Sequence, residues 1–307
     1  MSAERIKLVP DLFKEYPHIP IAHKAGKLII FIGAGVSTLW GCRRWPEMAQ
    51  YLMDKCYESE KIDHWTKKIL VDKYQYNPRK LITIAKSIMG DKYLDGIRGA
   101  LQTNEEKRIK YPSIFANLAA LNAIFITTNI DVNLSSLLDS RNVHMDSKKF
   151  HPSLLKPKTC FHLHGRIDVP ESLVMTIDEY LRRYREEEIK AFLDHVFFKD
   201  NYAVLFVGYS IDEMEIIDFM LEKHGPQQKG QINKSYVLMP MFSKEEDILM
   251  HEENYFDLLG TTVIPYAIDR NGYEQLYQLL SDWTAAMLER DVEKEFYNLI
   301  KLIEANK

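Results

Sequence analysis

The sequence predicts an α/β protein with a doubly wound, mostly parallel sheet, and two observations support this prediction. Short runs that are apolar at every position recur along the chain, which is typical of strands buried on both faces. Patterns with helical spacing separate these runs, and strands that alternate with helices form parallel sheets. The expected strands, in chain order, are 28–32, 123–128, 160–163, 203–207, 235–239 and 262–266. Together these features define a Rossmann-like fold class.

The composition restricts the possible functions. The chain has 307 residues, enough for one large α/β domain or for a core domain with an insertion. Its formal net charge of −4 gives no electrostatic reason to expect direct nucleic-acid or membrane binding. No apolar run is long enough to span a bilayer, and the first residues lack a signal-peptide core. The scattered cysteines, Cys42, Cys56 and Cys160, fit reduced thiols in a cytoplasmic protein.

The pattern divides the chain into an arm, a main domain and a tail. Residues 1–25, which contain Pro10, Pro17 and Pro20, are expected to form an N-terminal arm that covers either a sheet edge or a neighbouring subunit. The main domain is expected at 26–270. Residues 271–307 are expected to form a C-terminal helical segment. The apolar stripe of this segment either packs on the chain's own core, which we favour, or provides an interface.

An inserted helical module is expected at about 50–112, because this region carries no strand alternation. Just before and inside it, one helical face carries an apolar stripe that predicts core packing: Trp45, Met48, Ala49, Leu52 and Cys56. Further helices are expected at 178–200, 211–224 and 244–259.

A glycine turn follows the first strand, in the stretch KLIIFIGAGVS at 27–37. Gly33 and Gly35 lack β-carbons, so the backbone there can approach a ligand closely. The turn predicts either a pyrophosphate site or a tight strand-to-helix connection without a ligand, and these residues alone do not decide between them. Thr38 occupies the third position of the dinucleotide fingerprint G-x-G-x-x-G, which argues against an ordinary dehydrogenase. No G-x-x-x-x-G-K-[ST] occurs, which argues against a phosphate-loop NTPase.

Polar residues or glycines follow most of the other predicted strands. Asn129 and Asp131 follow the second strand, His164 follows the third, and Gly208 follows the fourth. Each has a structural explanation on its own, since Asn and Asp cap helices and a lone histidine is often a core residue. Ligands of parallel sheets bind at the carboxyl ends of the strands, so the coincidence of these residues at one edge favours a nucleotide site.

The motifs GAGVS, TTNID, HLHG and VGYS, in this order and on these strands, resemble the sirtuin family (silent information regulator two). The likeness is greatest to the bacterial sirtuin-like branch found in anti-phage defence proteins, and it covers about residues 25–270. It implies a doubly wound NAD-binding domain with an inserted helical module. TTNID and the His-Gly pair are its most specific parts.

The resemblance also implies the roles of individual residues. Asn129 would lie against the nicotinamide ribose and a water molecule, and His164 would act as general base. His162 shares a strand face with His164, but His164 is the favoured base because it lies at the strand end. The residues that would bind NAD are Gly33, Ala34, Gly35, Ser37, Asp131, Gly208, Ser210 and Asp269. Of these, Asp131 would orient the pocket and Asp269 would approach the adenine.

Departures from the family affect the predicted activity. Deacylating sirtuins typically hold a structural zinc ion with two C-x-x-C pairs, and this chain has none, so we expect no zinc ribbon and no metal. The segment GCRRWPEM replaces the deacylase motif G-I-P-D-F-R. Both departures favour water as the acceptor, and therefore an NAD+ glycohydrolase that depletes NAD in anti-phage (abortive infection) defence. The alternatives are an NAD-dependent deacylase or ADP-ribosyltransferase, and a non-catalytic NAD- or ADP-ribose-binding module.

Cleavage of the nicotinamide–ribose bond suits these residue types. The leaving group is a neutral pyridine that needs no acid, whereas a base with a pKa near neutrality and a positioned amide assist the sugar and the water. The resemblance further implies a homo-oligomer and a regulatory protein partner such as a HerA-like ATPase or a phage-sensing protein. The sequence does not indicate whether the product is linear or cyclic ADP-ribose.

Overall fold

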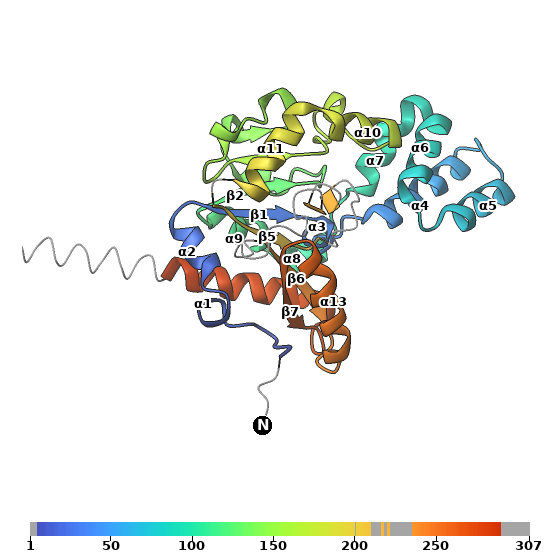
Figure 1. Cartoon of the computed structure of the whole chain (residues 1–307). Coiled ribbons are helices and arrows are strands. Elements are labelled where there is room, and N and C mark those ends of the chain that lie inside the picture. The colour runs from blue at the N-terminus through green and yellow to red at the C-terminus, as the bar shows by residue number, and fades with distance from the viewer. Residues whose placement is uncertain (1–4, 200, 210–215, 218–219, 222–234, 290–307) are drawn as a thin grey trace, which may run out of the picture.

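The computed structural model describes residues 5–199, 201–209, 216–217, 220–221 and 235–289, and these form an α/β fold around one sheet (Figure 1). The sheet has seven strands in the order β3-β4-β2-β1-β5-β6-β7, and every pairing between them is parallel. The strands are β1 (Leu28–Ile32), β2 (Ala123–Thr127), β3 (Val143–His144), β4 (Cys160–His162), β5 (Ala203–Val207), β6 (Ser235–Met241) and β7 (Thr261–Ala267). The predicted fold class is therefore confirmed, and no zinc ribbon is evident among the described residues.

Helices cover both faces of the sheet (Figure 1). They are α1 (Leu12–Glu15), α2 (His18–Lys24), α3 (Ala34–Thr38), α4 (Trp45–Glu58), α5 (His64–Tyr74), α6 (Pro78–Met89), α7 (Tyr93–Ala100), α8 (Glu105–Lys110), α9 (Ile114–Ala120), α10 (Ile177–Arg185), α11 (Glu187–Phe198), α13 (Glu246–Leu258) and a helix at 275–289. None of the helices in the described ranges is both long and apolar enough to cross a membrane.

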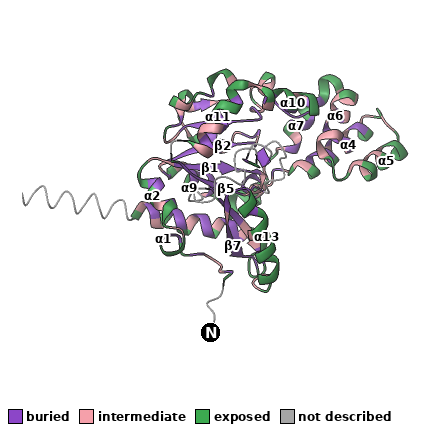
Figure 2. Cartoon of the chain, viewed as in Figure 1, coloured by how far each residue is buried: buried purple, intermediate pink, exposed green. Residues whose placement is uncertain are grey.

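Strand β1 lies at the centre of the sheet, and all five of its residues are buried (Figure 2). Its side chains alternate between two apolar cores, with Ile30 in one and Phe31 in the other. Helices α2, α9 and 275–289 contribute to the core that contains Ile30, whereas α11 and α13 contribute to the core that contains Phe31. Burial on both faces explains why the strand is apolar at every position.

The strand order places a switch point next to β1. The chain builds β2, β3 and β4 on one side of β1 and then β5, β6 and β7 on the other. Loops that leave such strands diverge at this point, and ligands of open α/β sheets bind there, at the carboxyl ends of the strands.

Between β1 and β2 the chain forms a helical module, α4 to α7, that extends to one side of the sheet (Figure 1). Helix α8 lies back toward the sheet, where Lys110 pairs with Glu274. Helices α4, α6 and α7 share an apolar core of their own, which includes Leu52, Ile82 and Ile97. Ile130 and Met175 join this core from the sheet side, so the module is packed against the loops that follow β2 and β4.

Both ends of the described chain pack on the sheet. Lys7 forms a parallel bridge with Tyr266, and its carbonyl accepts a hydrogen bond from the Ala267 N–H at 2.7 Å, so the arm covers the β7 edge. At the other end, Leu279 and Trp283 are buried in the core beside β1, which fits the favoured alternative for the tail. Residues 290–307 and most of the helix expected at 211–224 lie outside the described residues.

The ends of β2, β4 and β7 differ from the predictions by one residue, and two further details also differ. Strand β3 was not predicted, because two residues carry no periodic pattern and only their pairing with Cys160 and Phe161 defines them. Strand β6 continues past its predicted end through Pro240 to Met241. Beyond Val237, β6 pairs with β7 and not with β5, so the missing N–H of Pro240 costs no ladder hydrogen bond on the β5 side.

Candidate active site

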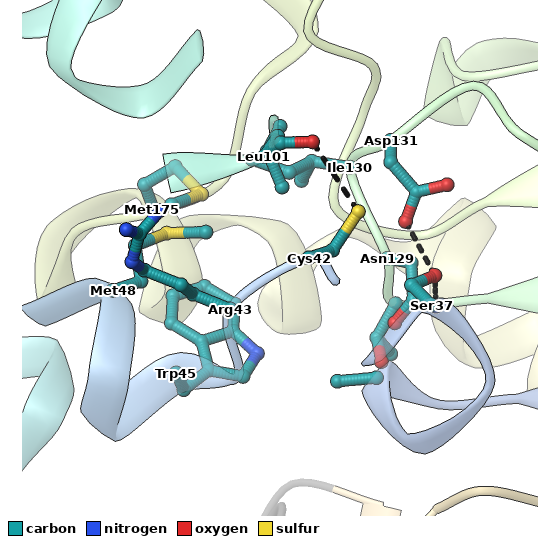
Figure 3. A pocket seen from close by; sticks show the side chains of 12 residues that line it. Ser37, Cys42, Arg43, Trp45, Met48, Leu101, Asn129, Ile130, Asp131 and Met175 are labelled. Carbon is teal, nitrogen blue, oxygen red and sulfur yellow. Dashed lines mark hydrogen bonds between the residues drawn. The ribbon is translucent and has the colours of Figure 1, made fainter. Parts of the chain in front are cut away.

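A small pocket lies where the carboxyl ends of β1 and β2 meet the helical module (Figure 3). Its polar side is formed by residues that follow the two strands, and the module supplies the opposite side. The lining residues are Ala34, Ser37, Cys42, Arg43, Trp45, Met48, Leu101, Thr128, Asn129, Ile130, Asp131 and Met175. The structure thus brings together four residues that the sequence predicted for the site: Ala34, Ser37, Asn129 and Asp131.

A hydrogen-bond network fixes the polar side of the pocket. Asn129 Nδ2 donates to Gly33 O at 2.9 Å and to Ser37 Oγ at 3.0 Å. Ser37 Oγ in turn donates to Asp131 Oδ2 at 2.7 Å (Figure 3). The turn after β2 is held to β1 as well, because Thr127 Oγ1 donates to Ile32 O and accepts from the Asn129 N–H. Asn129 is therefore oriented by groups from both strands before any ligand binds.

Asp131 is the buried carboxylate of this network. Its second oxygen accepts a hydrogen bond from the Asn133 N–H at 3.0 Å. Burial raises the pKa of Asp131, against the opposing effect of the hydrogen bonds from Ser37 and Asn133. The carboxylate is thus placed to orient Ser37 and, through it, the amide of Asn129.

The glycine turn is packed tightly against the loop after β5. A β-carbon on Gly33 would lie 2.4 Å from Gly208 O, and one on Gly35 would lie 2.8 Å from Gly208 Cα. The backbone donors are engaged as well, since the Gly33 N–H donates to Val207 O at 3.0 Å and the Gly35 N–H to Gly208 O at 2.8 Å. Gly208 itself has a positive φ of 60°. These contacts give all three glycines a packing role, and a pyrophosphate would compete with Gly208 for the Gly35 N–H.

His164 lies beside the pocket in an aromatic enclosure. It is fully buried, and its Nε2 shares a 3.1 Å hydrogen bond with the hydroxyl of Tyr184. The ring of Tyr180 packs on the imidazole at 4.7 Å, and Trp45 meets it edge-on at 6.1 Å. Trp45 also lines the pocket, so it forms part of a wall between the pocket and the enclosure.

Burial lowers the pKa of His164 well below its usual value, and the positive charges of Arg79 and Arg183 lower it further. The imidazole is therefore neutral at neutral pH. Arg79 is held in place by the ring of Tyr180, with its guanidinium carbon 3.5 Å from the ring centre.

The neighbouring histidine has a different role. His162 Nδ1 donates to the backbone carbonyl of Asn129 at 3.0 Å, which ties the end of β4 to the turn after β2. Burial lowers the pKa of His162 to about 4. Strand β4 ends at His162, so His164 lies beyond the strand rather than on it.

Other predicted site residues lie elsewhere or outside the described residues. Ser210 belongs to the latter group. Asp269 follows β7, three strands from β1, and its carboxylate accepts hydrogen bonds from the backbone N–H and the hydroxyl of Ser243, both at 2.9 Å. Asp269 is therefore remote from the pocket, and its role at an adenine stays a prediction.

Arg43 and Trp45 loosely retain positions of the deacylase motif, but the sequence did not indicate the contributions of Cys42 and Leu101 to the pocket wall. Cys42 Sγ donates to Leu101 O at 3.3 Å, and burial raises its pKa to about 12, so it is an unreactive thiol in the pocket wall. Arg43 Nη1 donates to Gly99 O at 3.1 Å, and its guanidinium carbon lies 4.2 Å from the ring centre of Tyr51. The position of Arg43 just after the glycine turn was the available signal. No cluster of His, Cys, Asp and Glu within the described ranges has the form of a metal site.

The fold and the strand-end pocket define a Rossmann-like α/β protein with the features of a nucleotide site. Residues 123–259 match the sequence profile of the SIR2-like domain. This match supports a sirtuin-like family and suggests an activity that involves NAD. It includes Asn129, Asp131 and His164, and it excludes the glycine turn and the helical module. No curated protein matches the chain.

Proposed function

We propose that the chain is an NAD+ glycohydrolase, which cleaves the nicotinamide–ribose bond of NAD to give nicotinamide and ADP-ribose. The observation that carries this proposal is the position of Asn129. Its amide is fixed by Gly33 O and Ser37 Oγ, it lines the pocket at the strand ends, and it lies inside the SIR2-like match. His164 follows the neighbouring strand β4, which pairs directly with β2.

The site residues suit this chemistry. When the bond breaks, positive charge develops on the ribose and nicotinamide departs as a neutral base, so no acid is required. The Oδ1 of Asn129 accepts none of the hydrogen bonds found among the described residues, which leaves it able to accept one from a water or a ribose hydroxyl. Neutral His164 is the proposed acceptor of the proton that the water or hydroxyl gives up, and its lowered pKa makes it a weaker base than the near-neutral base expected from the sequence. The guanidinium of Arg43 places positive charge beside the pocket, which suits a pyrophosphate.

The pocket must open for this reaction. Its volume of about 20 Å³ accommodates one or two water molecules, not a nicotinamide ribosyl group. Trp45, which borders both the pocket and His164, is the side chain whose movement would join them. We propose that NAD binding displaces Trp45 and so brings the ribose against Asn129 and His164 together.

A product assay tests the reaction and separates it from the alternatives. The purified chain is incubated with NAD, and nicotinamide, ADP-ribose, cyclic ADP-ribose and the intact protein mass are measured with and without an acyl-lysine peptide. We expect nicotinamide and ADP-ribose in equal amounts without a peptide. Turnover only with the peptide would indicate a deacylase, a protein mass increase would indicate an ADP-ribosyltransferase, and binding without turnover would indicate a sensor.

We further propose that the activity depletes NAD during phage infection and is controlled by a protein partner. Cells that express the chain would lose NAD after infection, and cells that express Asn129→Ala would not. If infected cells that express the unsubstituted chain retain their NAD, the role in defence is contradicted, whether or not phage growth is restricted. The in vitro activity would not be affected by this result.

A further inference from the structure

Two helical surfaces of the described chain carry opposite charge and exposed apolar side chains. The first, here called the basic surface, comprises residues 61–80 around α5, with six Lys and Arg residues against two Asp. The second, here called the acidic surface, comprises residues 242–258 around α13, with six carboxylates against one lysine. The chain as a whole has a net charge of only −4, so both segments depart strongly from the average.

The outer side of the basic surface is exposed in the described part of the chain, whereas its inner side packs on the module core through Leu70 and Val71. Helix α5 has no buried residue, although it is 11 residues long. Trp65 and Ile69, one helical turn apart, are 69% and 59% exposed, and Tyr76 just beyond the helix is 93% exposed. Lys68 and Lys73 are exposed along the same side. Single apolar side chains are common on exposed helix faces, but an apolar stripe of neighbouring residues between lysines indicates a surface that becomes covered.

The acidic surface has the complementary composition. Only Leu249 and Phe256 of α13 are buried, and they face the sheet. On the outer side Leu258, Met250 and Tyr255 are 66%, 48% and 46% exposed. Asp247 and Asp257 are exposed beside them, and neither forms an ion pair with another described residue.

The two surfaces cannot satisfy each other within one copy. Helix α5 lies at the far end of the helical module, whereas α13 lies beside β7 at the edge of the sheet (Figures 1 and 2). Together they carry half of the large hydrophobic side chains that are exposed in the described part of the chain. Because both members of a complementary pair lie on one chain, the partner that fits each surface is a second copy.

We propose that copies of this chain associate head to tail, with the basic surface of one copy packed on the acidic surface of the next. The apolar stripes around Trp65 and Leu258 form the centre of the contact, and Lys68 and Lys73 face Asp247 and Asp257 around it. A contact between two different surfaces is heterologous, so it closes into a ring or continues as a filament, depending on the rotation per copy.

Paired charge reversals test this assembly on the full chain. Light scattering after size-exclusion chromatography gives the mass of the wild type, of Lys68→Glu/Lys73→Glu and of Asp247→Lys/Asp257→Lys. We expect a wild type of several copies that dissociates at about 1 M salt, where charges are screened beyond ~3 Å. Each double variant should have the mass of one copy, because the charged positions that face each other at the centre of the contact then carry the same sign. An equimolar mixture of the two variants should assemble again, because each now complements the other.

A matched control reverses two carboxylates on neither surface, Glu171→Lys/Glu188→Lys, both exposed, and should assemble as the wild type does. Three results would overturn the proposal. The first is a wild type that stays a single copy at every concentration, including a single copy whose basic surface binds single-stranded DNA. The second is a pair of double variants that keep the wild-type mass. The third is a mixture that fails to assemble although each variant is folded.

Discussion

The two halves of the candidate site are held in different ways. On the β1 and β2 side, Ser37, Asn129 and Asp131 are joined by short hydrogen bonds and face a pocket. On the β4 side, His164 is enclosed by the rings of Trp45, Tyr180 and Tyr184. The polar half is thus organised in advance, whereas the aromatic half is closed and must rearrange to meet a substrate. This difference suggests that access to His164, and not the orientation of Asn129, limits the activity of the isolated chain.

The largest effect is expected at the histidine itself. His164→Gln should lower kcat for nicotinamide release by about 10²–10⁴-fold, because it removes the proposed general base. His162→Gln is the matched control. His162 is buried as well and lies two positions earlier, but its Nδ1 donates to the Asn129 carbonyl and it has no proposed part in proton transfer. It should lose less activity. An equal or greater loss in His162→Gln would show that the base had been assigned to the wrong histidine. The aromatic enclosure of His164 would then have no part in the mechanism.

The polar half depends on the tight contact between the glycine turn and Gly208. Gly33 has a φ of −102°, which any residue adopts, so glycine is required there because a β-carbon would lie 2.4 Å from Gly208 O and 2.6 Å from Tyr209 Cα. Gly33→Ala should lower the free energy of unfolding by about 1–3 kcal/mol through overpacking. Urea denaturation measures this.

Gly90→Ala provides the comparison, because Gly90 has a φ of 56° and no atom within 4 Å of a β-carbon. Its ψ of −125° lies outside the left-handed helical region, so the substitution should cost about 1–3 kcal/mol of backbone strain without any overpacking. If Gly33→Ala were neutral, the turn would be loose enough to release its N–H groups, and the pyrophosphate role of the turn would gain support.

The pH dependence of stability tests the burial of Asp131. Its pKa is raised in the folded chain, so the folded state binds a proton more tightly than the unfolded state, whose carboxyl has a pKa of about 3.9. The stability from this proton is present below that pH and is lost as the pH rises through the folded pKa. Relative to Asp131→Asn, the wild type should therefore be less stable at pH ~7 than at pH ~4.

Asp139→Asn gives the opposite sign as a control. Arg141 lowers the pKa of Asp139 to about 2, so its contribution is present at neutral pH and is lost as the pH falls through the folded pKa. Thermal unfolding at pH ~7, ~4 and ~2 provides the measurement, because most of the Asp139 contribution is lost between the last two values. A wild type that gains stability over Asp131→Asn with rising pH would mean that Ser37 and Asn133 outweigh burial.

The smallest effect is expected for the hydroxyl that contacts His164. Tyr184→Phe removes the 3.1 Å hydrogen bond to Nε2 and keeps the ring. One hydrogen bond contributes about 0.5–1.5 kcal/mol, so kcat should fall by roughly 2–10-fold. Tyr202→Phe, which loses a hydroxyl bonded to Leu155 O away from the site, should leave kcat unchanged. Identical kinetics of Tyr184→Phe and the wild type would show that packing alone positions the imidazole.

The same comparison explains what the sequence could predict. Asn129, Asp131 and Ser37 directly follow strands, and the carboxyl ends of parallel strands meet at one edge, so their proximity followed from strand order alone. Trp45 was assigned to an apolar helix face, and Met48, Ala49 and Leu52 of that face are indeed buried, but Trp45 itself is only half-buried and lines the pocket.

The enclosure around His164 was not predictable by this reasoning. Tyr180 and Tyr184 lie in a segment that the periodicity assigned to one helix at 178–200, whereas the chain has two helices that meet at Glu186. A periodic pattern gives the apolar face of a helix but not the angle at which the helix crosses a sheet. The glycines were recognised but their contacts were not, because Gly208 is distant in sequence from Gly33 and Gly35.

The central claim is that Asn129 and His164 act on the same ribose, and a double-mutant cycle tests it most directly. Rates of nicotinamide release are measured for the wild type, Asn129→Ala, His164→Gln and the double variant, with folding confirmed by circular dichroism. If both residues act on one ribose, the double variant should lose about as much activity as the more damaging single variant. Losses that multiply, so that the free-energy changes add, would place the two side chains at separate tasks and contradict the account.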